Sequence, residues 1–99
     1  SFDTSAVEDM GSMFSDCTSL VSLDLSGFNT SKVMYMNDMF YNCSSLKTLD
    51  LSGFSSESHP SCHDMFLHTP KELQLKLSDA FRAYLDKFQA YLDALRKKQ

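Results

Sequence analysis

The sequence predicts an α/β repeat fold in which a parallel sheet of about three short strands is built from stacked units and closed by a C-terminal amphipathic helix. Two observations predict it: a 26-residue segment occurs twice in succession, and an uninterrupted helical pattern fills the last fifth of the chain. At 99 residues the chain can form one domain. It begins with Ser rather than Met, so we expect a processed product or a fragment.

The repeat comprises residues 2–27 and 28–53, which agree at 15 of 26 positions without a gap. Shifting the register by a further 26 residues places 54–78 as a third, degenerate unit with seven matches to the second. Each regular unit ends in LxxLxLSG, the rhythm of a leucine-rich repeat, in which alternate leucines of a short strand point inward. No such unit can bury its apolar face alone, so the units are expected to stack into a solenoid.

Within each regular unit a glycine, Gly27 or Gly53, ends the strand, and the polar residues of the strand alternate with leucines. The outward-facing side chains form the first candidate binding surface: Ser22, Asp24, Ser26, Thr48, Asp50, Ser52, Gln74 and Lys76. Asp24 and Asp50 would lie side by side, but repetition explains them more simply than paired catalysis or calcium binding. The spacing of Val7, Met10, Met13 and Phe14 suits a short helical segment that lays one face on the core.

The residues FDTSAVEDM..MF..C.SL.SLDLSGF and FNTSKVMYM..MFYNCSSLKTLDLSGF resemble the BspA-like bacterial surface-protein repeat, a leucine-rich-repeat relative of about 26 residues. The resemblance is specific over residues 2–54. It implies a recognition or scaffold role and no catalysis. Such repeats also occur in long proteins of protists and algae, so the resemblance does not fix the organism.

His59, Cys62, His63 and His68 raise the possibility of a zinc site, because zinc prefers Cys and His ligands. Their spacing matches no established finger, and adjacent residues of a helix point about 100 degrees apart. In the 26-residue register, His59 and Cys62 occupy the buried-type positions of Val33 and Met36. We therefore favour a degenerate last unit over a metal site, and expect no cofactor.

The cysteines give no sign of a disulfide framework or of a nucleophile. Cys17 and Cys43 are equivalent positions of stacked units, and their side chains should run in parallel. We expect both to be buried free thiols that pack as small apolar groups. The first two units contain no His that could act as a base, so an enzyme is not expected.

The segment from Ser78 onward predicts a helix over about 79–97, within a C-terminal element of 79–99. Its aromatic seam is the second candidate surface: Phe81, Tyr84, Phe88 and Tyr91. The seam either folds back as the cap of the last unit or packs on a partner. A capping box at Thr69 would allow a helix to begin there, but the alternation of Leu73, Leu75 and Leu77 favours a third strand at about 73–77.

Composition excludes two partner classes. The net charge is −4 with mixed signs, which lacks the basic patch of a nucleic-acid-binding domain, and no apolar run is long enough for a membrane span. We expect a non-catalytic interaction or adhesion module, a fragment of a cell-surface or secreted protein, that contacts a protein or a glycan through the strand face. The alternative is a structural or linker subunit of a large intracellular or organellar complex, docked through the aromatic helix.

Overall fold

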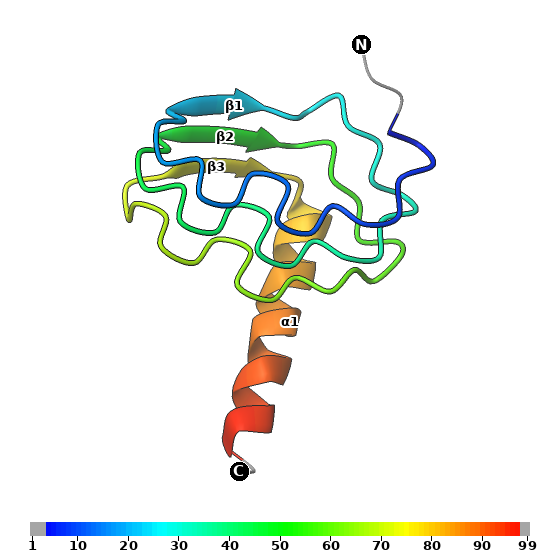
Figure 1. Ribbon diagram of the computed structural model, residues 1–99. Helices are drawn as coiled ribbons and strands as arrows, with labels where there is room; N and C mark the ends of the chain where they lie inside the picture. Colours follow the sequence, from blue (N-terminus) through cyan, green and yellow to red (C-terminus); the bar gives the residue numbers. More distant parts are fainter. Residues whose placement is uncertain (1–3, 98–99) are drawn as a thin grey trace.

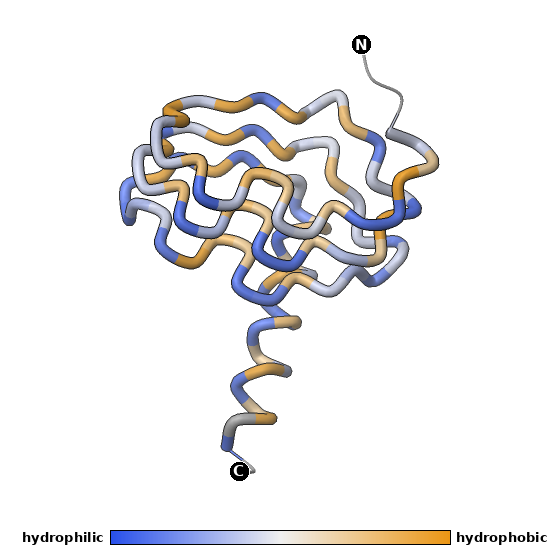
Figure 2. The backbone as a smooth tube through the Cα atoms, viewed as in Figure 1, coloured by the Kyte–Doolittle hydropathy of each residue, from blue (hydrophilic) through white to orange (hydrophobic). Residues whose placement is uncertain are grey.

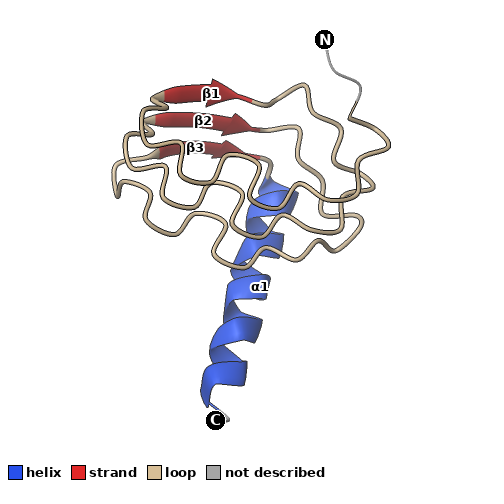
Figure 3. Ribbon diagram, in the orientation of Figure 1, coloured by secondary structure: helices blue, strands red, loops and turns tan. Residues whose placement is uncertain are grey.

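Three short strands and one long helix organise the chain. The computed structural model describes residues 4–97, with the backbone alone at residue 96. The elements are β1 (Ser22–Asp24), β2 (Thr48–Leu51), β3 (Gln74–Leu77) and α1 (Asp79–Lys97). The strands form one parallel sheet in the order β1-β2-β3, and α1 follows β3 directly (Figures 1 and 3). The expected three-strand parallel sheet and C-terminal helix are confirmed; Phe2 of the first repeat and residues 98–99 of the C-terminal element lie outside the described part.

The sheet register follows the 26-residue period. Leu23 pairs with Leu49, and Leu49 pairs with Leu75. We call residues 4–27, 28–53 and 54–78 coils 1, 2 and 3, since each contributes one strand and one return segment that lies beside the equivalent segment of the next coil (Figure 1). The third strand occurs where the leucine alternation placed it. The rival helix from Thr69 is wrong, because residues 69–73 are irregular apart from a single turn at residues 71–72.

The return segments are arcs of turns, so the expected short helix over Val7 to Phe14 is wrong. In the arcs of coils 1 and 2, alternate backbone N–H groups donate to carbonyls of the next coil instead of to carbonyls four residues back in their own coil. In coil 1 the donors and acceptors are Met10 to Tyr35, Ser12 to Asn37, Phe14 to Met39 and Asp16 to Tyr41, at 2.7–2.9 Å. In coil 2 they are Met36 to Ser61, Asp38 to His63, Phe40 to Met65 and Asn42 to Leu67, at 2.8–2.9 Å.

Left-handed backbone conformations explain why these arcs are not helical. Each arc places two residues at φ between 52° and 64°: Ser12 and Asp16, Asp38 and Asn42, Asp64 and His68. Such residues interrupt a right-handed helix, and Asp and Asn tolerate the conformation better than most residues. The arcs therefore turn every four residues and present alternate peptide groups to the neighbouring coil.

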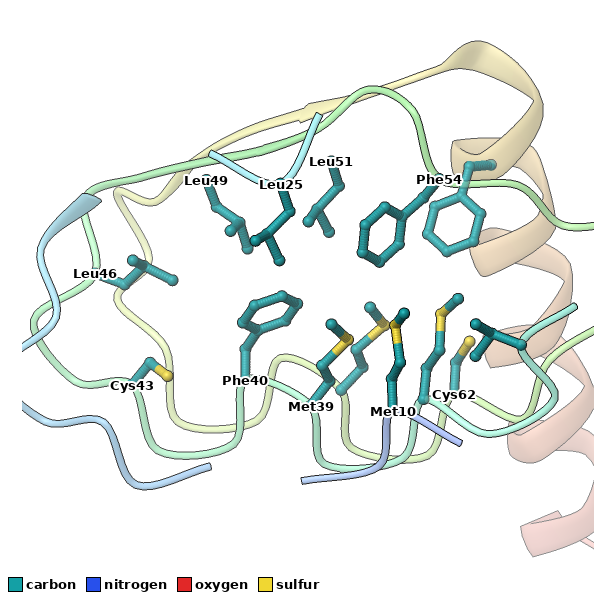
Figure 4. Close-up of a cluster of buried hydrophobic side chains, with 14 residues drawn as sticks. Met10, Leu25, Met39, Phe40, Cys43, Leu46, Leu49, Leu51, Phe54 and Cys62 are labelled. Carbon is teal, nitrogen blue, oxygen red and sulfur yellow. The ribbon is translucent and has the colours of Figure 1, made fainter. Parts of the chain in front are cut away.

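The core lies between the sheet and the arcs. Leucines from the strands meet Met, Phe and Cys side chains from the arcs (Figure 4). Coil 2 is the most completely covered, with Met39, Phe40 and Cys43 at 0% exposure. Met13, the equivalent of Met39, is 44% exposed, which contradicts its expected place in the core. Coil 1 is the outermost coil of the described residues, so its interior side chains are covered from one side only.

Helix α1 begins where coil 3 ends and closes part of its open side. The Ser78 hydroxyl oxygen accepts the N–H of Phe81 at 3.1 Å, which is an N-cap bond. Phe81 is fully buried against Phe54, with ring centroids 5.8 Å apart. The second half of α1 extends beyond the coils, with apolar and polar residues alternating around it (Figure 2). Over the described residues, α1 lacks the apolar length required to cross a bilayer.

Candidate functional site: the exposed strand face

Two rows of polar side chains cross the exposed face of the sheet. The first row is Ser22, Thr48 and Gln74, and the second is Asp24, Asp50 and Lys76. The rows arise because outward positions repeat every 26 residues and the strands pair in that register. Within the first row, the Thr48 hydroxyl donates to the Ser22 hydroxyl oxygen at 2.8 Å. The face therefore presents an ordered set of hydroxyl, amide and charged groups.

The turn that follows each strand fixes the two carboxylates. An oxygen of Asp24 accepts the backbone N–H of Ser26 at 2.9 Å, and Asp50 accepts that of Ser52 at the same distance. Hydrogen bonds from the side chain and then the backbone of the following serine lower the pKa of each carboxyl group, and Lys76 lowers it further. Both carboxylates are therefore ionised and oriented at neutral pH. Ser26 and Ser52 act here by holding the carboxylates.

The positive groups of the face lie at its coil 3 end. The ammonium of Lys76 is 4.0 Å from the Asp50 carboxylate, and its side chain is 73% exposed. Arg82, in the first turns of α1, lines the same shallow depression of about 550 Å³ as the two polar rows. Sequence reasoning missed Arg82. The available signal was that the helix was expected to begin immediately after the third strand, which brings its first turns to the edge of the sheet.

The four candidate zinc ligands do not converge. His59 contacts Tyr84 and His63 contacts Phe88, with ring centroids 6.1 and 5.3 Å apart, so both lie against α1. His68 instead contacts Tyr41, at 5.6 Å. Among residues 4–97, no group of three or more His, Cys, Asp or Glu side chains is arranged to hold a metal ion.

His59 does not occupy the buried position expected from the register. It is exposed, and the neighbouring Pro60 is buried instead. Proline disfavours the right-handed helical conformation for the residue before it, and His59 adopts φ 52°, a left-handed value that its equivalents Val7 and Val33 do not share. The backbone therefore turns the imidazole outward toward α1.

The cysteines are free thiols in three different environments. Cys62 is buried, as the register predicted, and burial raises the pKa of its thiol to about 12. Cys43 is also buried, and its thiol lies 3.1 Å from the Phe14 carbonyl oxygen. Cys17 is only half-buried because it belongs to the outermost described coil, contrary to the expected full burial. Cys62 and Cys43 are consequently poor nucleophiles at neutral pH.

Part of the aromatic seam of α1 packs on the coils, and part of it is exposed to solvent. Phe81 is fully buried, so it is not free to contact a partner as expected. The Tyr84 hydroxyl donates to the Pro60 carbonyl oxygen at 2.5 Å, and burial raises the pKa of that hydroxyl. Phe88 is half-buried over coil 3. Only Tyr91, at 60% exposure, remains largely open among the four predicted docking residues.

Comparison with known families gives one match. A family model described as "Mycoplasma protein of unknown function, DUF285" matches residues 1–80. The chain belongs to the DUF285 family. The DUF285 match includes all three strands and ends at residue 80 in the first turn of α1, so the whole aromatic seam, from Phe81 onward, lies outside it. No curated protein and no solved structure matches this DUF285 chain.

Proposed function

We propose that this DUF285 chain is a non-catalytic interaction module, built as a short leucine-rich-repeat solenoid, that binds a protein or glycan through its exposed strand face. In this proposal it belongs to a cell-surface or secreted protein and serves in adhesion. The observation that carries the proposal is the in-register arrangement of the two polar rows, with both carboxylates held by the turns that follow their strands.

The backbone pattern supports a solenoid. The same set of four inter-coil hydrogen bonds recurs between coils 1 and 2 and between coils 2 and 3, each spanning 25 residues. The strands repeat in parallel with the same period. The resemblance to the BspA-like repeat points the same way, because DUF285 is associated with BspA-like repeat surface proteins.

The charge distribution supports a binding role for the strand face. Asp24 and Asp50 lie toward coils 1 and 2, whereas Lys76 and Arg82 lie toward coil 3 and α1. A face with separated charges and preoriented hydroxyl groups selects partners by complementary charge and hydrogen bonding. Repeat proteins commonly bind partners on such extended faces.

An array of purified extracellular-matrix proteins and glycans tests the proposal. We expect the 99-residue chain to bind a member of the array, and Thr48→Arg to abolish that binding by placing a long cation at the centre of the first row. Thr18→Arg is the matched control, because Thr18 is an exposed threonine in a turn away from the sheet. Binding that survives Thr48→Arg and is lost with Thr18→Arg would contradict the assignment of the face, as would failure to bind any member.

A second candidate function is docking of α1 into a larger assembly as a structural or linker subunit. It is favoured by the exposure of Tyr91 at 60% and Leu95 at 42% on the part of the helix that extends beyond the coils. In that case the double variant Tyr91→Ala and Leu95→Ala abolishes partner binding while Thr48→Arg leaves it unchanged. The strand-face proposal predicts the opposite pattern.

A further inference from the structure

The arc of coil 3 carries a row of backbone N–H groups that have no backbone acceptor. In coils 1 and 2 the equivalent groups donate to carbonyls of the next coil at 2.7–2.9 Å. In coil 3 the N–H groups of Asp64, Phe66 and His68 lack such an acceptor among the described residues. The pattern is limited to alternate positions, since the Ser61 N–H donates back to the Met34 carbonyl at 2.9 Å. We call Asp64, Phe66 and His68 the donor row.

The donor row keeps the backbone geometry of its bonded equivalents. Asp64 and His68 have φ values of 52° and 64°, beside 58° and 59° for Asp38 and Asn42 in coil 2. The Phe66 ring continues the parallel ring stack of the core, 5.7 Å from the next centroid. The N–H groups of the donor row therefore point away from coil 2. Helix α1 follows β3 directly, so residues 4–97 contain no further coil that could accept these bonds.

A groove of about 320 Å³ separates the donor row from α1. Its apolar walls are Met65, Phe66 and Leu67 on the coil 3 side, and Leu85 and Phe88 on the helix side. Leu67 is 43% exposed, and Phe66, Leu85 and Phe88 are half-buried. The residues that line this groove are distinct from those that line the depression of the strand face. Aligned N–H groups beside a half-covered apolar wall suit an extended peptide, whose carbonyls accept the hydrogen bonds and whose side chains fill the apolar space.

Two carboxylates at the groove decide which acceptor fits it. Asp64 on the coil 3 side and Asp86 on the helix side both line the groove, and both are exposed. Among the described residues, the lining includes no Lys, Arg or His side chain. This negative pair repels an anion such as phosphate, although a row of N–H groups alone would attract one. A neutral main-chain carbonyl is not repelled, and a neighbouring basic side chain is attracted.

We propose that this groove is a second interaction surface, which binds an extended, basic segment of a partner protein. The segment runs beside the coil 3 arc in the place that a further coil would take, and its carbonyls accept the N–H bonds of the donor row. An apolar side chain of the segment fills the space between Phe66 and Phe88, and a basic side chain contacts Asp64 and Asp86. The hydrogen bonding is that which joins coil 1 to coil 2 and coil 2 to coil 3, so the contact continues an interface that the fold already repeats.

Peptide titration of the 99-residue chain, followed by NMR, tests the proposal. The probes are end-blocked peptides of about ten residues, each with one lysine and one phenylalanine at varied separations in a serine and glycine background. A matched set carries glutamate in place of lysine. We expect saturable binding of at least one lysine peptide and about tenfold weaker binding of its glutamate counterpart. The amide protons of Asp64, Phe66 and His68 should shift downfield as they gain acceptors.

Two pairs of variants locate the site. Gln89→Trp fills the groove from the helix side and should abolish binding. Ala90→Trp adds the same side chain at a helix position outside the groove and should leave binding unchanged. Asp86→Lys should weaken binding of the lysine peptide about tenfold, whereas Glu57→Lys makes the same change of net charge outside the groove and should have no effect. All of these side chains are exposed, so the fold is expected to persist in each variant.

Several results would overturn the proposal. No lysine peptide could bind at concentrations up to about 1 mM, or the glutamate set could bind equally well. Binding that survives Gln89→Trp, or that both members of a variant pair weaken alike, would place the peptide elsewhere. Amide shifts confined to the strand face, at Thr48 and Asp50, would assign the peptide to that face and refute the groove.

Discussion

Replacement of Phe40 by alanine tests the stacked core most severely. Phe40 is completely buried, and its ring lies between those of Phe14 and Phe66 at 5.6 and 5.7 Å, with interplanar angles of 0° and 5°. The same residue type occupies the equivalent position in all three coils. Phe14→Ala is therefore a matched comparison that removes the same atoms from the outer end of the stack.

The structure sets the expected magnitudes. A buried Phe→Ala substitution destabilises a protein by about 3–5 kcal/mol, and the loss of two ring neighbours places Phe40→Ala toward the upper part of that range. Phe14 is half-buried and has one ring neighbour, so we expect about 1–2 kcal/mol for Phe14→Ala. In a domain of this size each kcal/mol lowers Tm by about 4–8 °C. Phe40→Ala should consequently lower Tm by at least about 12 °C.

Urea unfolding followed by circular dichroism measures both changes as differences in the free energy of unfolding. Tyr91→Ala is the surface control, expected within about 0.5 kcal/mol of the parent chain because the side chain is 60% exposed. A cost for Phe14→Ala equal to or greater than that for Phe40→Ala would refute the reasoning. It would mean that coil 2 does not lie between the other two coils.

Three further predictions concern single groups. At pH 8 iodoacetamide should modify Cys17 before Cys62, whose thiol pKa of about 12 leaves roughly one thiolate in ten thousand; equal rates without denaturant would contradict the burial. The pKa values of Asp24 and Asp50 are lowered from 3.8 in the folded protein, so the stability that these carboxylates contribute is present above pH 3.8 and is lost as the pH falls through the folded values. The urea concentration at the unfolding midpoint should therefore fall less on acidification in the variant with Asp24→Asn and Asp50→Asn than in the parent chain. Ser78→Ala should cost about 1 kcal/mol as a lost N-cap, measured by thermal unfolding against Ser78→Gly, which should cost less.

The repeat made the sheet predictable from the sequence. Identical residues at a 26-residue period require equivalent environments, and the alternating leucines then set the strands and their register. The same argument placed β3, although only seven positions of the third unit match the second. Ser78 and the long pattern after it likewise specified the start of α1. In these segments the secondary structure that the local sequence favours is also the one that contacts between coils require.

The arcs were not predictable in the same way. The spacing of Val7, Met10, Met13 and Phe14 fits a helix as well as a series of turns, and the difference depends on backbone bonds to the next coil. Left-handed conformations at non-glycine residues such as Ser12 and His68 leave little trace in the sequence. His59 shows the further limit, because the following proline changed the local backbone and turned a register-equivalent side chain outward.

Part of the candidate site was predictable from the sequence, and part depended on how the elements pack. The polar rows of the strand face followed from the period, whereas the contribution of Arg82 depended on how closely α1 follows β3. The aromatic seam was correctly read as an amphipathic face, but its pattern alone did not distinguish the buried Phe81 from the exposed Tyr91. That distinction depends on where coil 3 ends relative to the length of the helix.

Amide hydrogen exchange resolved by NMR tests the central claim, that three coils stack in a 26-residue register, most directly. The account predicts slow exchange for the arc N–H groups that donate to the next coil, at Ser12, Phe14, Asp38 and Phe40. It predicts faster exchange for their coil 3 equivalents Asp64 and Phe66, whose N–H groups have no backbone acceptor among the described residues. Equal protection of all three arcs, or fast exchange at Asp38 and Phe40, would contradict the stacked register.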